Sequence, residues 1–210
     1  MTLVNFKEEL DNKIKIIEQD SDAEVMVLFN QWSDRYPGAH LRLGLFFSLL
    51  LPTIYYFSPW ELPDLIYLIV LQLIGFFLGH YLAYLPRLKK ILATSKELKE
   101  EVQQAAIECY HNIGITNHPK RLGMMVYLSL GERRMNIIWD KGLKEVANSE
   151  LEAWAKSTRK EMKKLGWEQG LLQGLEELKS LLAVKAPQTS DGSENHLGNI
   201  VTKEQEAPKA

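Results

Sequence analysis

Ser33 and Asp34 are the first residues of the chain whose types and position could support chemistry. They follow residues 23–29, an apolar and partly β-branched run that is typical of a strand covered on both faces. In an open α/β sheet, ligands gather where strands end at their carboxyl edge, so this hydroxyl and this carboxylate are candidate site residues. The alternative is an ordinary polar turn at residues 31–37, placed just before a membrane segment.

Standard catalytic templates give little support beyond this pair. The chain contains no Gly-x-x-x-x-Gly-Lys phosphate loop, no Gly-x-Gly-x-x-Gly, no His-Glu-x-x-His and no Cys-x-x-Cys. Triad members need not be adjacent in sequence, so Ser33, His111 and His118 could be pieces of a Ser–His–acid set. Histidines in loops and at helix ends are more often solvated, which is the interpretation we prefer.

Two uncharged apolar runs, residues 43–60 and 65–85, organise the chain. They contain 18 and 21 residues without a formal charge. As helices they would span roughly 27 and 32 Å at about 1.5 Å per residue, close to the ~30 Å hydrocarbon core of a bilayer. Residues 58–64 between them hold two prolines, which stop a helix. The pattern predicts a transmembrane helical hairpin rather than a buried helical pair of a soluble domain.

The charges around the hairpin indicate its orientation. The tip carries only acidic charges, whereas both outer flanks are basic: Arg35, Arg42, Arg87, Lys89 and Lys90. Short loops rich in Lys and Arg stay in the cytoplasm, so we predict an inner (plasma) membrane protein with two spans, both termini and the soluble domain being cytoplasmic. Arg87, Lys89 and Lys90 also suit anionic lipid head groups.

Small residues line one face of the second run. Gly75 and Gly79 form Gly-x-x-x-Gly and Ala83 extends the stripe, so another helix can approach closely. We expect the hairpin's own first helix there, with a homodimer through the same face as the alternative. His80, beside the stripe, is expected to be a neutral, hydrogen-bonded residue near the interface rather than part of a proton relay. Pro52 is expected to kink the first run.

Helices are predicted where apolar residues recur at three- and four-residue steps. Such steps fill residues 3–17 and 167–183. Thr94 and Glu97 form a capping box that opens a further helix, for which Gly114 is a C-terminal cap. Ser149 and Glu152 form a second capping box, which predicts a helix from there to residue 165.

An antiparallel strand pair is predicted between these helices. Residues 123–130 are strand-like, Gly131 and Glu132 can make a two-residue turn, and residues 133–139 return with Met135, Ile137 and Trp139 on one face. Asp140 then closes the second strand.

Composition sets the outer limits. The net charge is −2, which gives no basic surface for gripping nucleic acid. Cys109 is the single cysteine, so no internal disulfide forms. We divide the chain into a first helix and strand (residues 1–40), the hairpin (41–86), the rest of one modest domain (87–185) and a disordered tail (186–210) with one possible docking piece.

A family resemblance rests on several of these segments. Residues 22–27, Asp-Ala-Glu-Val-Met-Val, are similar to a strand-entry signature whose usual form is roughly Gly-Ala-Glu-Ile-Val-Val. A helix ending in Gly114-Ile115, the strand pair at residues 122–138 and Asp140-Lys141-Gly142-Leu143 follow in the matching order. Residues 195–199 resemble an Asn-Glu-Leu-Pro-Asn tail. In these features most of the soluble chain resembles the TPM domain family. The resemblance implies a Rossmann-like α/β/α sandwich with a small mixed sheet, interrupted here by the hairpin.

The resemblance also implies functions. Members are linked to acid phosphatase activity, to binding of divalent cations (calcium), and to assembly or repair of membrane protein complexes. Many carry an Asp-Asn-Gly turn before the second strand, where this chain has residues 117–123 without a carboxylate. Only Asp34 and Asp140, both just past strand ends, remain as candidate catalytic or metal-ligating acids, for calcium or magnesium. A hard cation prefers more oxygen ligands than these two provide.

Three hypotheses follow. The first is a non-enzymatic membrane-tethered domain that binds a membrane protein complex and helps to assemble or maintain it. The second is a phosphatase-type hydrolase that uses Asp34 and Asp140, with or without a divalent cation. It requires these two carboxylates to converge in one cleft. The third is a module that binds lipid or a small ligand through Arg87, Lys89 and Lys90.

Overall fold

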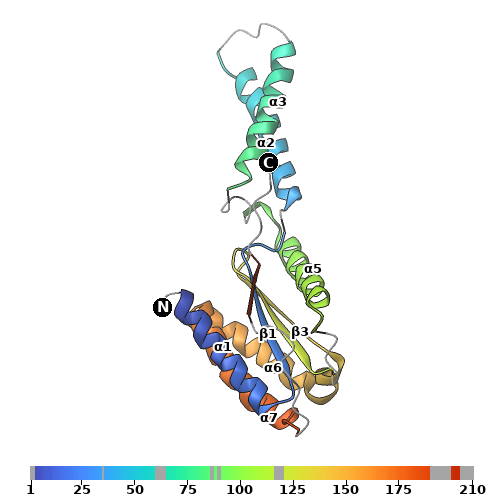
Figure 1. The fold of residues 1–210 in the computed structure, drawn as a ribbon. Helices are drawn as coiled ribbons and strands as arrows, with labels where there is room; N and C mark the ends of the chain where they lie inside the picture. Colours follow the sequence, from blue (N-terminus) through green and yellow to red (C-terminus); the bar gives the residue numbers. More distant parts are fainter. Residues whose placement is uncertain are drawn as a thin grey trace. The chain divides into compact units, whose positions relative to one another are not determined.

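The computed structural model describes residues 3–34, 36–59, 65–85, 88, 91–115, 121–189 and 200–203 (Figure 1). The chain forms two compact units. Met1–Ser33 together with Val102–Ala210 make the first, which we call the α/β unit, and Asp34–Glu101 make the second, the hairpin unit. The α/β unit is therefore discontinuous in sequence, since the hairpin unit is inserted between its first strand and the rest.

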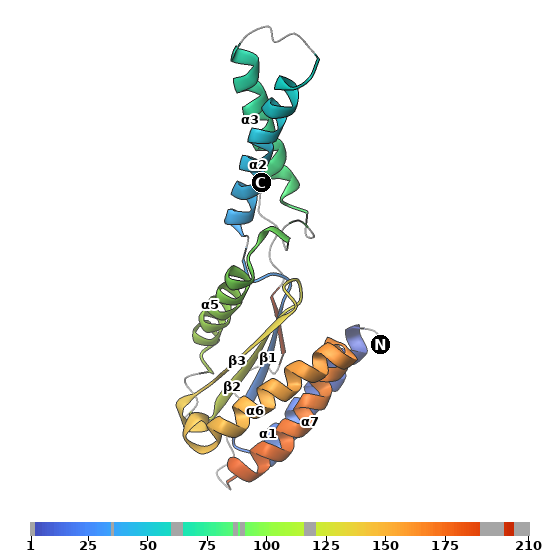
Figure 2. The ribbon, with the colours of Figure 1, turned by 180° about the vertical axis from the view of Figure 1, so that it is seen from behind.

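A small mixed sheet forms the centre of the α/β unit (Figure 2). Its strands are β1 (Glu24–Asn30), β2 (Gly123–Ser129), β3 (Arg134–Trp139) and β4 (Ile200–Lys203), in the spatial order β3-β2-β1-β4. β1 is parallel to β2 and β4, and β3 is antiparallel to β2. The predicted strand pair is thus confirmed. The prediction of a disordered tail is wrong for β4, while residues 195–199 lie outside the described residues.

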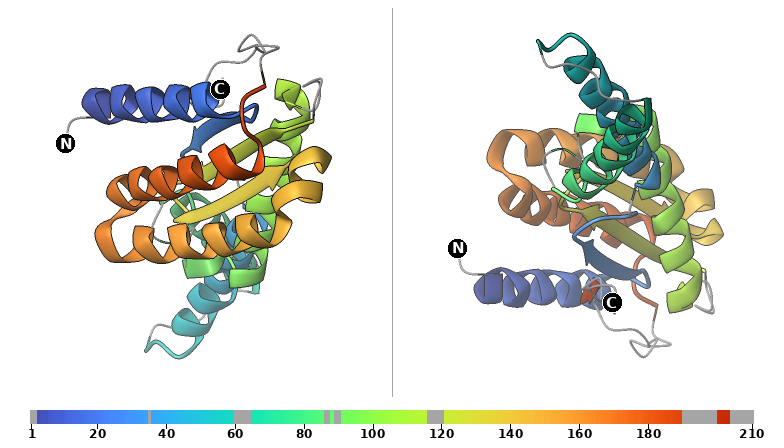
Figure 3. Two further views of the ribbon diagram at one scale, coloured as in Figure 1. Left: turned by 90° about the horizontal axis from the view of Figure 1, so that it is seen from below. Right: turned by 90° about the horizontal axis from the view of Figure 1, so that it is seen from above.

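Three helices cover one face of the sheet: α1 (Leu3–Asp20), α6 (Lys141–Leu165) and α7 (Trp167–Lys185). The left view of Figure 3 shows them side by side along their lengths. Their apolar stripes and the odd-numbered residues of β1 make one core cluster. Phe6, Phe29 and Trp167 meet edge to face in it, with ring centroids 5.1 to 6.1 Å apart. The predicted core residues of the last helix are all buried: Leu171, Leu172, Leu175, Leu178 and Leu182.

The other face of the sheet is covered by α5 (Ser95–Ile113). From Val102 onward its apolar side packs on even-numbered residues of β1 and on β2, including Met26 and Tyr127. Because helices cover both faces, all seven residues of β1 are buried, as its continuous apolar sequence predicts. Gly114 ends α5 with a φ of 81°, which confirms the predicted cap.

The start of α6 differs from the predicted one. Asp140 is its N-cap and accepts a hydrogen bond from the Lys141 N–H at 2.7 Å, so the helix begins eight residues before Ser149. Ser149 bonds instead to the neighbouring Glu150. The helical path is interrupted at Ala147, whose φ is −148°. α6 thus consists of two helical segments, and the predicted start at Ser149 lies just after the break, near the beginning of the second one.

The connection between β2 and β3 also differs from the predicted two-residue turn. It comprises residues 130–133, and its left-handed residue is Arg133, with a φ of 54°. Gly131 is needed for a close approach: a Cβ there would lie 2.5 Å from the Gln31 carbonyl oxygen and 2.5 Å from the Trp32 ring. The turn is thus packed against the chain that follows β1.

The hairpin unit contains α2 (Pro37–Tyr56) and α3 (Leu65–Leu82), which pack on each other. Both are long and apolar enough to cross a membrane, by length and composition. Of the most apolar 18-residue stretch of each helix, only 22% is buried in α2 and 11% in α3. α2 is continuous across Pro52, so the expected kink does not break the helix.

Candidate functional site

Polar side chains gather at the carboxyl end of β1 and β2. We name Asn30, Ser33, Tyr127, Ser129 and Glu132 the carboxyl-end cluster. Asn30 and Ser129 are paired across the two strands, Tyr127 is two residues before Ser129, and Ser33 and Glu132 belong to the segments that follow β1 and β2. All but Ser33 are buried, and Glu132 is only 3% exposed. This is the edge where open α/β sheets bind ligands.

Hydrogen bonds run through the cluster in one direction. The Asn30 Nδ2 donates to the Tyr127 hydroxyl at 3.0 Å, which lies 3.2 Å from the Ser33 Oγ. Ser33 donates its backbone N–H to Glu132 Oε1 at 2.8 Å and its hydroxyl to Oε2 at 3.4 Å. Since the Ser33 proton goes to the carboxylate, the Tyr127 proton is directed at the Ser33 oxygen. The order of donation is therefore Asn30, Tyr127, Ser33, Glu132.

The Tyr127 hydroxyl stays protonated in this chain of bonds. Burial raises the pKa of Tyr127, while its hydrogen bonds with Ser33 and Asn30 lower it by less. A neutral phenol both accepts from Asn30 and donates to Ser33. The cluster thus ties the β2–β3 connection to the segment after β1, supported by Gly131 N–H, which donates to the Gln31 carbonyl at 2.8 Å.

Two buried atoms of the cluster retain unused bonding capacity. Asn30 Oδ1 and Ser129 Oγ make no hydrogen bond to any part of the chain that the structure describes. By strand alternation both side chains lie on the α5 face, on directly paired residues. The carboxylate of Glu132, in contrast, already accepts two bonds from Ser33.

Asp34, the first predicted acid, makes a local contact. One of its carboxylate oxygens accepts the Tyr36 N–H at 2.9 Å, a short-range bond typical of an Asx turn. Tyr36 has a φ of 56° and directly precedes α2. Asp34 thus shapes the entry to the hairpin.

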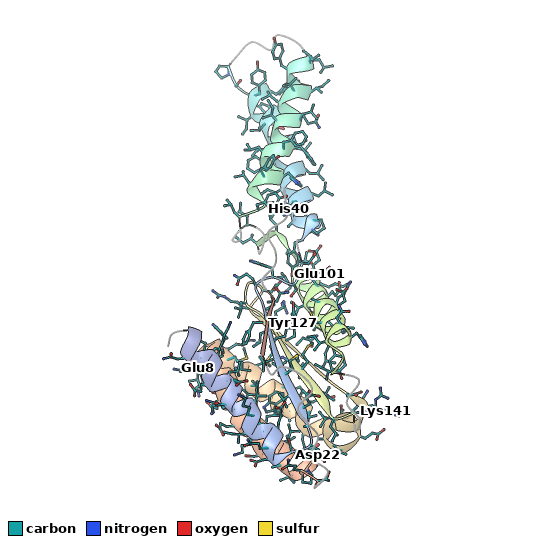
Figure 4. The ribbon with its side chains drawn as sticks, viewed as in Figure 1. Glu8, Asp22, His40, Glu101, Tyr127 and Lys141 are labelled. Atoms are coloured by element: carbon teal, nitrogen blue, oxygen red, sulfur yellow. The ribbon has the colours of Figure 1, made fainter. Side chains whose placement is uncertain are left out.

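Asp140, the second predicted acid, follows the opposite end of the sheet. Trp139 pairs with Met124, next to the start of β2, and Met124 pairs with Val25 at the start of β1. Figure 4 shows Lys141 at the same end of the sheet as Asp22, and Tyr127 toward the other end. Asp140 caps α6 and lies 3.5 Å from the Arg121 Nε. With burial as the larger cause, its charge helps to raise the pKa of Tyr110 to about 12.

Asp140 thus lies in the α/β unit, beyond the end of the sheet opposite to the carboxyl-end cluster, whereas Asp34 belongs to the hairpin unit. No group of three or more His, Cys, Asp or Glu side chains within the described ranges could hold a metal ion. Each of the two predicted acids accepts one local backbone N–H, Asp34 from Tyr36 and Asp140 from Lys141.

The small residues of the second span lie against α2. A Cβ on Gly75 would be 2.4 Å from the Phe47 carbonyl oxygen, and one on Gly79 2.2 Å from that of Leu43. Ala83 is fully buried. The expected intramolecular partner is therefore found, and a dimer through this face would have to displace it.

Aromatic and imidazole rings meet at the base of the hairpin. The His40 ring is 5.1 Å from that of His80 and 4.5 Å from that of Tyr84, and its Nδ1 lies 3.2 Å from the His80 carbonyl oxygen. Nearby in sequence, Arg42 pairs with Glu97, which also closes the predicted capping box with Thr94. The Arg42 bond is the main reason that the pKa of Glu97 falls to about 2. Arg87, Lys89 and Lys90 lie outside the described residues.

Sequence reasoning located Ser33 but missed Tyr127 and Glu132. Tyr127 sits within an apolar strand, where it resembles any core residue, and Glu132 follows a glycine, which favours a turn interpretation.

Comparison with known proteins gives a fold and no family. No protein-family model matches the chain, and no curated protein is similar to it in sequence. A solved structure is similar: the NMR structure of the BA42 protein from the psychrophilic bacterium Bizionia argentinensis, with a TM-score of 0.58 and 14% identity. The match covers 97% of this chain and 96% of the other. At this identity the likeness is one of fold.

Proposed function

We propose that the protein is a membrane-tethered, TPM-like domain without catalytic activity that binds a membrane protein complex and helps to assemble or maintain it. The observation that carries the proposal is the uncovered apolar surface of α2 and α3. Phe57 and Leu65 are 80% and 74% exposed. Contiguous apolar surface on this scale is not stable in water and marks contact with lipid or another protein.

The α/β unit fits the role of a scaffold carried by this anchor. Helices on both faces of a sheet with parallel β1, β2 and β4 are consistent with a Rossmann-like sandwich, the finer fold that we assign to it. The polar residues at its carboxyl edge bind one another, as the series of hydrogen bonds from Asn30 to Glu132 illustrates. This arrangement supports a binding role more than a hydrolase role.

Membrane integration and orientation can be tested together. The full chain should stay in the membrane pellet after alkaline carbonate extraction. In a Cys109→Ala background, an impermeant maleimide added to intact cells should label Ser58→Cys at the tip. The same reagent should label Ser180→Cys, in α7, only after lysis. Release by carbonate, or labelling of Ser180→Cys in intact cells, would contradict the anchor or its orientation respectively.

The binding role has a separate test. A photo-crosslinking residue at Phe77, which is 57% exposed on α3, should give one discrete adduct with another membrane protein, while the same residue at exposed Glu177 of α7 should give none. Phosphate-ester hydrolysis, measured with and without calcium or magnesium, should stay at background. Turnover that is lost in Asp34→Asn/Asp140→Asn would overturn the non-catalytic assignment.

A further inference from the structure

The outer edge of β3 could pair with a further β-strand. β3 is at one end of the strand order, so one of its sides has no strand partner among the strands that the structure describes. Asp140 donates its N–H to the Gly123 carbonyl of β2 at 2.8 Å. The backbone N–H and C=O groups of successive residues point alternately to the two sides of a strand. Those of the even-numbered residues of β3 therefore point toward β2, and those of the odd-numbered residues point outward. Met135, Ile137 and Trp139 therefore present their N–H and C=O groups at the edge.

One contact confirms this alternation. The outward N–H of Ile137 donates to the side-chain oxygen of the preceding Asn136 at 3.0 Å. This local bond takes the place of the hydrogen bond that the Ile137 N–H would donate to a neighbouring strand. Strand edges are normally protected by proline, inward-pointing charge or a bulge. β3 has the sequence Arg-Met-Asn-Ile-Ile-Trp, with no proline and no charge after Arg134.

A groove follows this edge between the helices on the two faces. Its volume is about 390 Å³, and its walls come from Gln103 and Ile107 of α5 and from Lys144, Asn148 and Glu152 of α6. These three α6 residues line the groove on both sides of the break at Ala147. A strand laid against β3 would lie in this groove.

We propose that β3 pairs with β3 of a second copy of this chain, antiparallel about a two-fold axis at Ile137, so that the two sheets become one. The odd-numbered residues of the strand are self-complementary in this register. Ile137 meets its own counterpart and Met135 meets Trp139 of the second copy, apolar pairs on the side of the main core. On the other side, Asn136 faces Ile138 of the second copy, and Arg134 faces Asp140, which also caps its own α6 and lies beside Arg121.

The helix beside the edge has matching charges. α6 begins directly after β3 and runs back along it (Figure 2). Lys144 thus lies toward the end of β3 and Glu152 toward its start. The two-fold axis reverses one copy, which brings Lys144 of each copy to Glu152 of the other. Because this pairing needs only the fold of the α/β unit, it does not depend on what the hairpin binds.

The test uses the full chain, by sedimentation equilibrium in a density-matched detergent over a range of protein concentrations. Wild type should form a dimer. Met135→Pro removes an outward N–H and leaves the bonds to β2 in place, so it should weaken dimerisation at least about tenfold. Met135→Ala, which shortens the same side chain but keeps the N–H, should weaken it far less.

A charge exchange gives an independent readout at two exposed residues. Lys144→Glu should weaken the dimer about tenfold, because two attractive contacts become repulsive, and Lys144→Glu/Glu152→Lys should restore it. A monomer at every concentration would overturn the proposal and leave the edge to a different partner. If neither Met135→Pro nor Lys144→Glu changed the dissociation constant of the dimer, the proposal would also be overturned. The contact between copies would then lie elsewhere, such as on the hairpin.

Discussion

At the scale of single residues, the notable feature is how differently two buried tyrosines are used. Tyr127 is fully buried and its hydroxyl joins Asn30 and Ser33. Tyr110, on α5, is 5% exposed and its hydroxyl has no hydrogen-bond partner among the described residues. A buried polar atom contributes to stability only when its bond is made, so the two hydroxyls should have opposite effects.

Removing each hydroxyl tests this difference. Tyr127→Phe leaves the Asn30 amide without its acceptor and should lower the free energy of unfolding by about 1–3 kcal/mol. Tyr110→Phe, the matched control, removes an unsatisfied group and should be neutral or slightly stabilising. Denaturant unfolding of the detergent-solubilised chain measures both. Equal losses for the two variants would show that the carboxyl-end cluster does not stabilise the fold.

At the scale of elements, the sequence predicted which helices and strands exist better than it predicted where they begin and end. Its apolar periodicity located α1, α5 and α7, and the Thr94–Glu97 box marked the start of α5 correctly. The same motif at Ser149 and Glu152 predicted only the second segment of α6, because the helix already begins after Asp140, which accepts the Lys141 N–H. Which of two available caps is used depends on where β3 ends, and that is set by pairing with β2.

The site was predictable only in part for a similar reason. Position after a strand was enough to single out Ser33 and Asp34. It was not enough to say which carboxylate Ser33 meets, because Glu132 comes from a segment 99 residues away. Asp140 also followed a strand, but the antiparallel direction of β3 put it at the opposite end of the sheet.

The contact between α2 and α3 gives the prediction at this scale. Gly79→Ala would place a methyl group 2.2 Å from the Leu43 carbonyl oxygen, with backbone rather than a flexible side chain to move. We expect a loss of about 1–3 kcal/mol and a lower midpoint of thermal unfolding in detergent. Gly38→Ala is the control, since its nearest neighbour would be 3.6 Å away. An unchanged midpoint for Gly79→Ala would mean that the helices are not held this closely.

At the scale of the whole molecule, stability should depend on pH through Glu18. Burial is the main cause that raises the pKa of this carboxyl to about 7, against a bond from the Val25 N–H that lowers it. Between about pH 4.5 and 7 the folded state therefore binds more protons than the unfolded state. The free energy of unfolding must fall as pH rises through this range.

Glu18→Gln should remove that dependence. The amide oxygen can still accept from Val25 but carries no charge to desolvate. Above pH 7 we expect the variant to be more stable than wild type by on the order of 1 kcal/mol, discounted for the partial exposure of the side chain. Glu8→Gln, at an exposed position of the same helix, is the control. Parallel stability profiles for wild type and Glu18→Gln from pH 5 to 8 would contradict the assignment.

The insertion of the hairpin unit between β1 and β2 also constrains biosynthesis. Glu24 pairs with Gly123, so β1 leaves the ribosome long before the strand that it binds. At about 5–20 residues per second, the delay is roughly 5–20 s. Throughout that time a largely apolar strand lacks its neighbour while the hairpin is being made. A nascent-chain chaperone is therefore expected to hold the first 33 residues, and arrest of translation just before Gly123 should trap that complex.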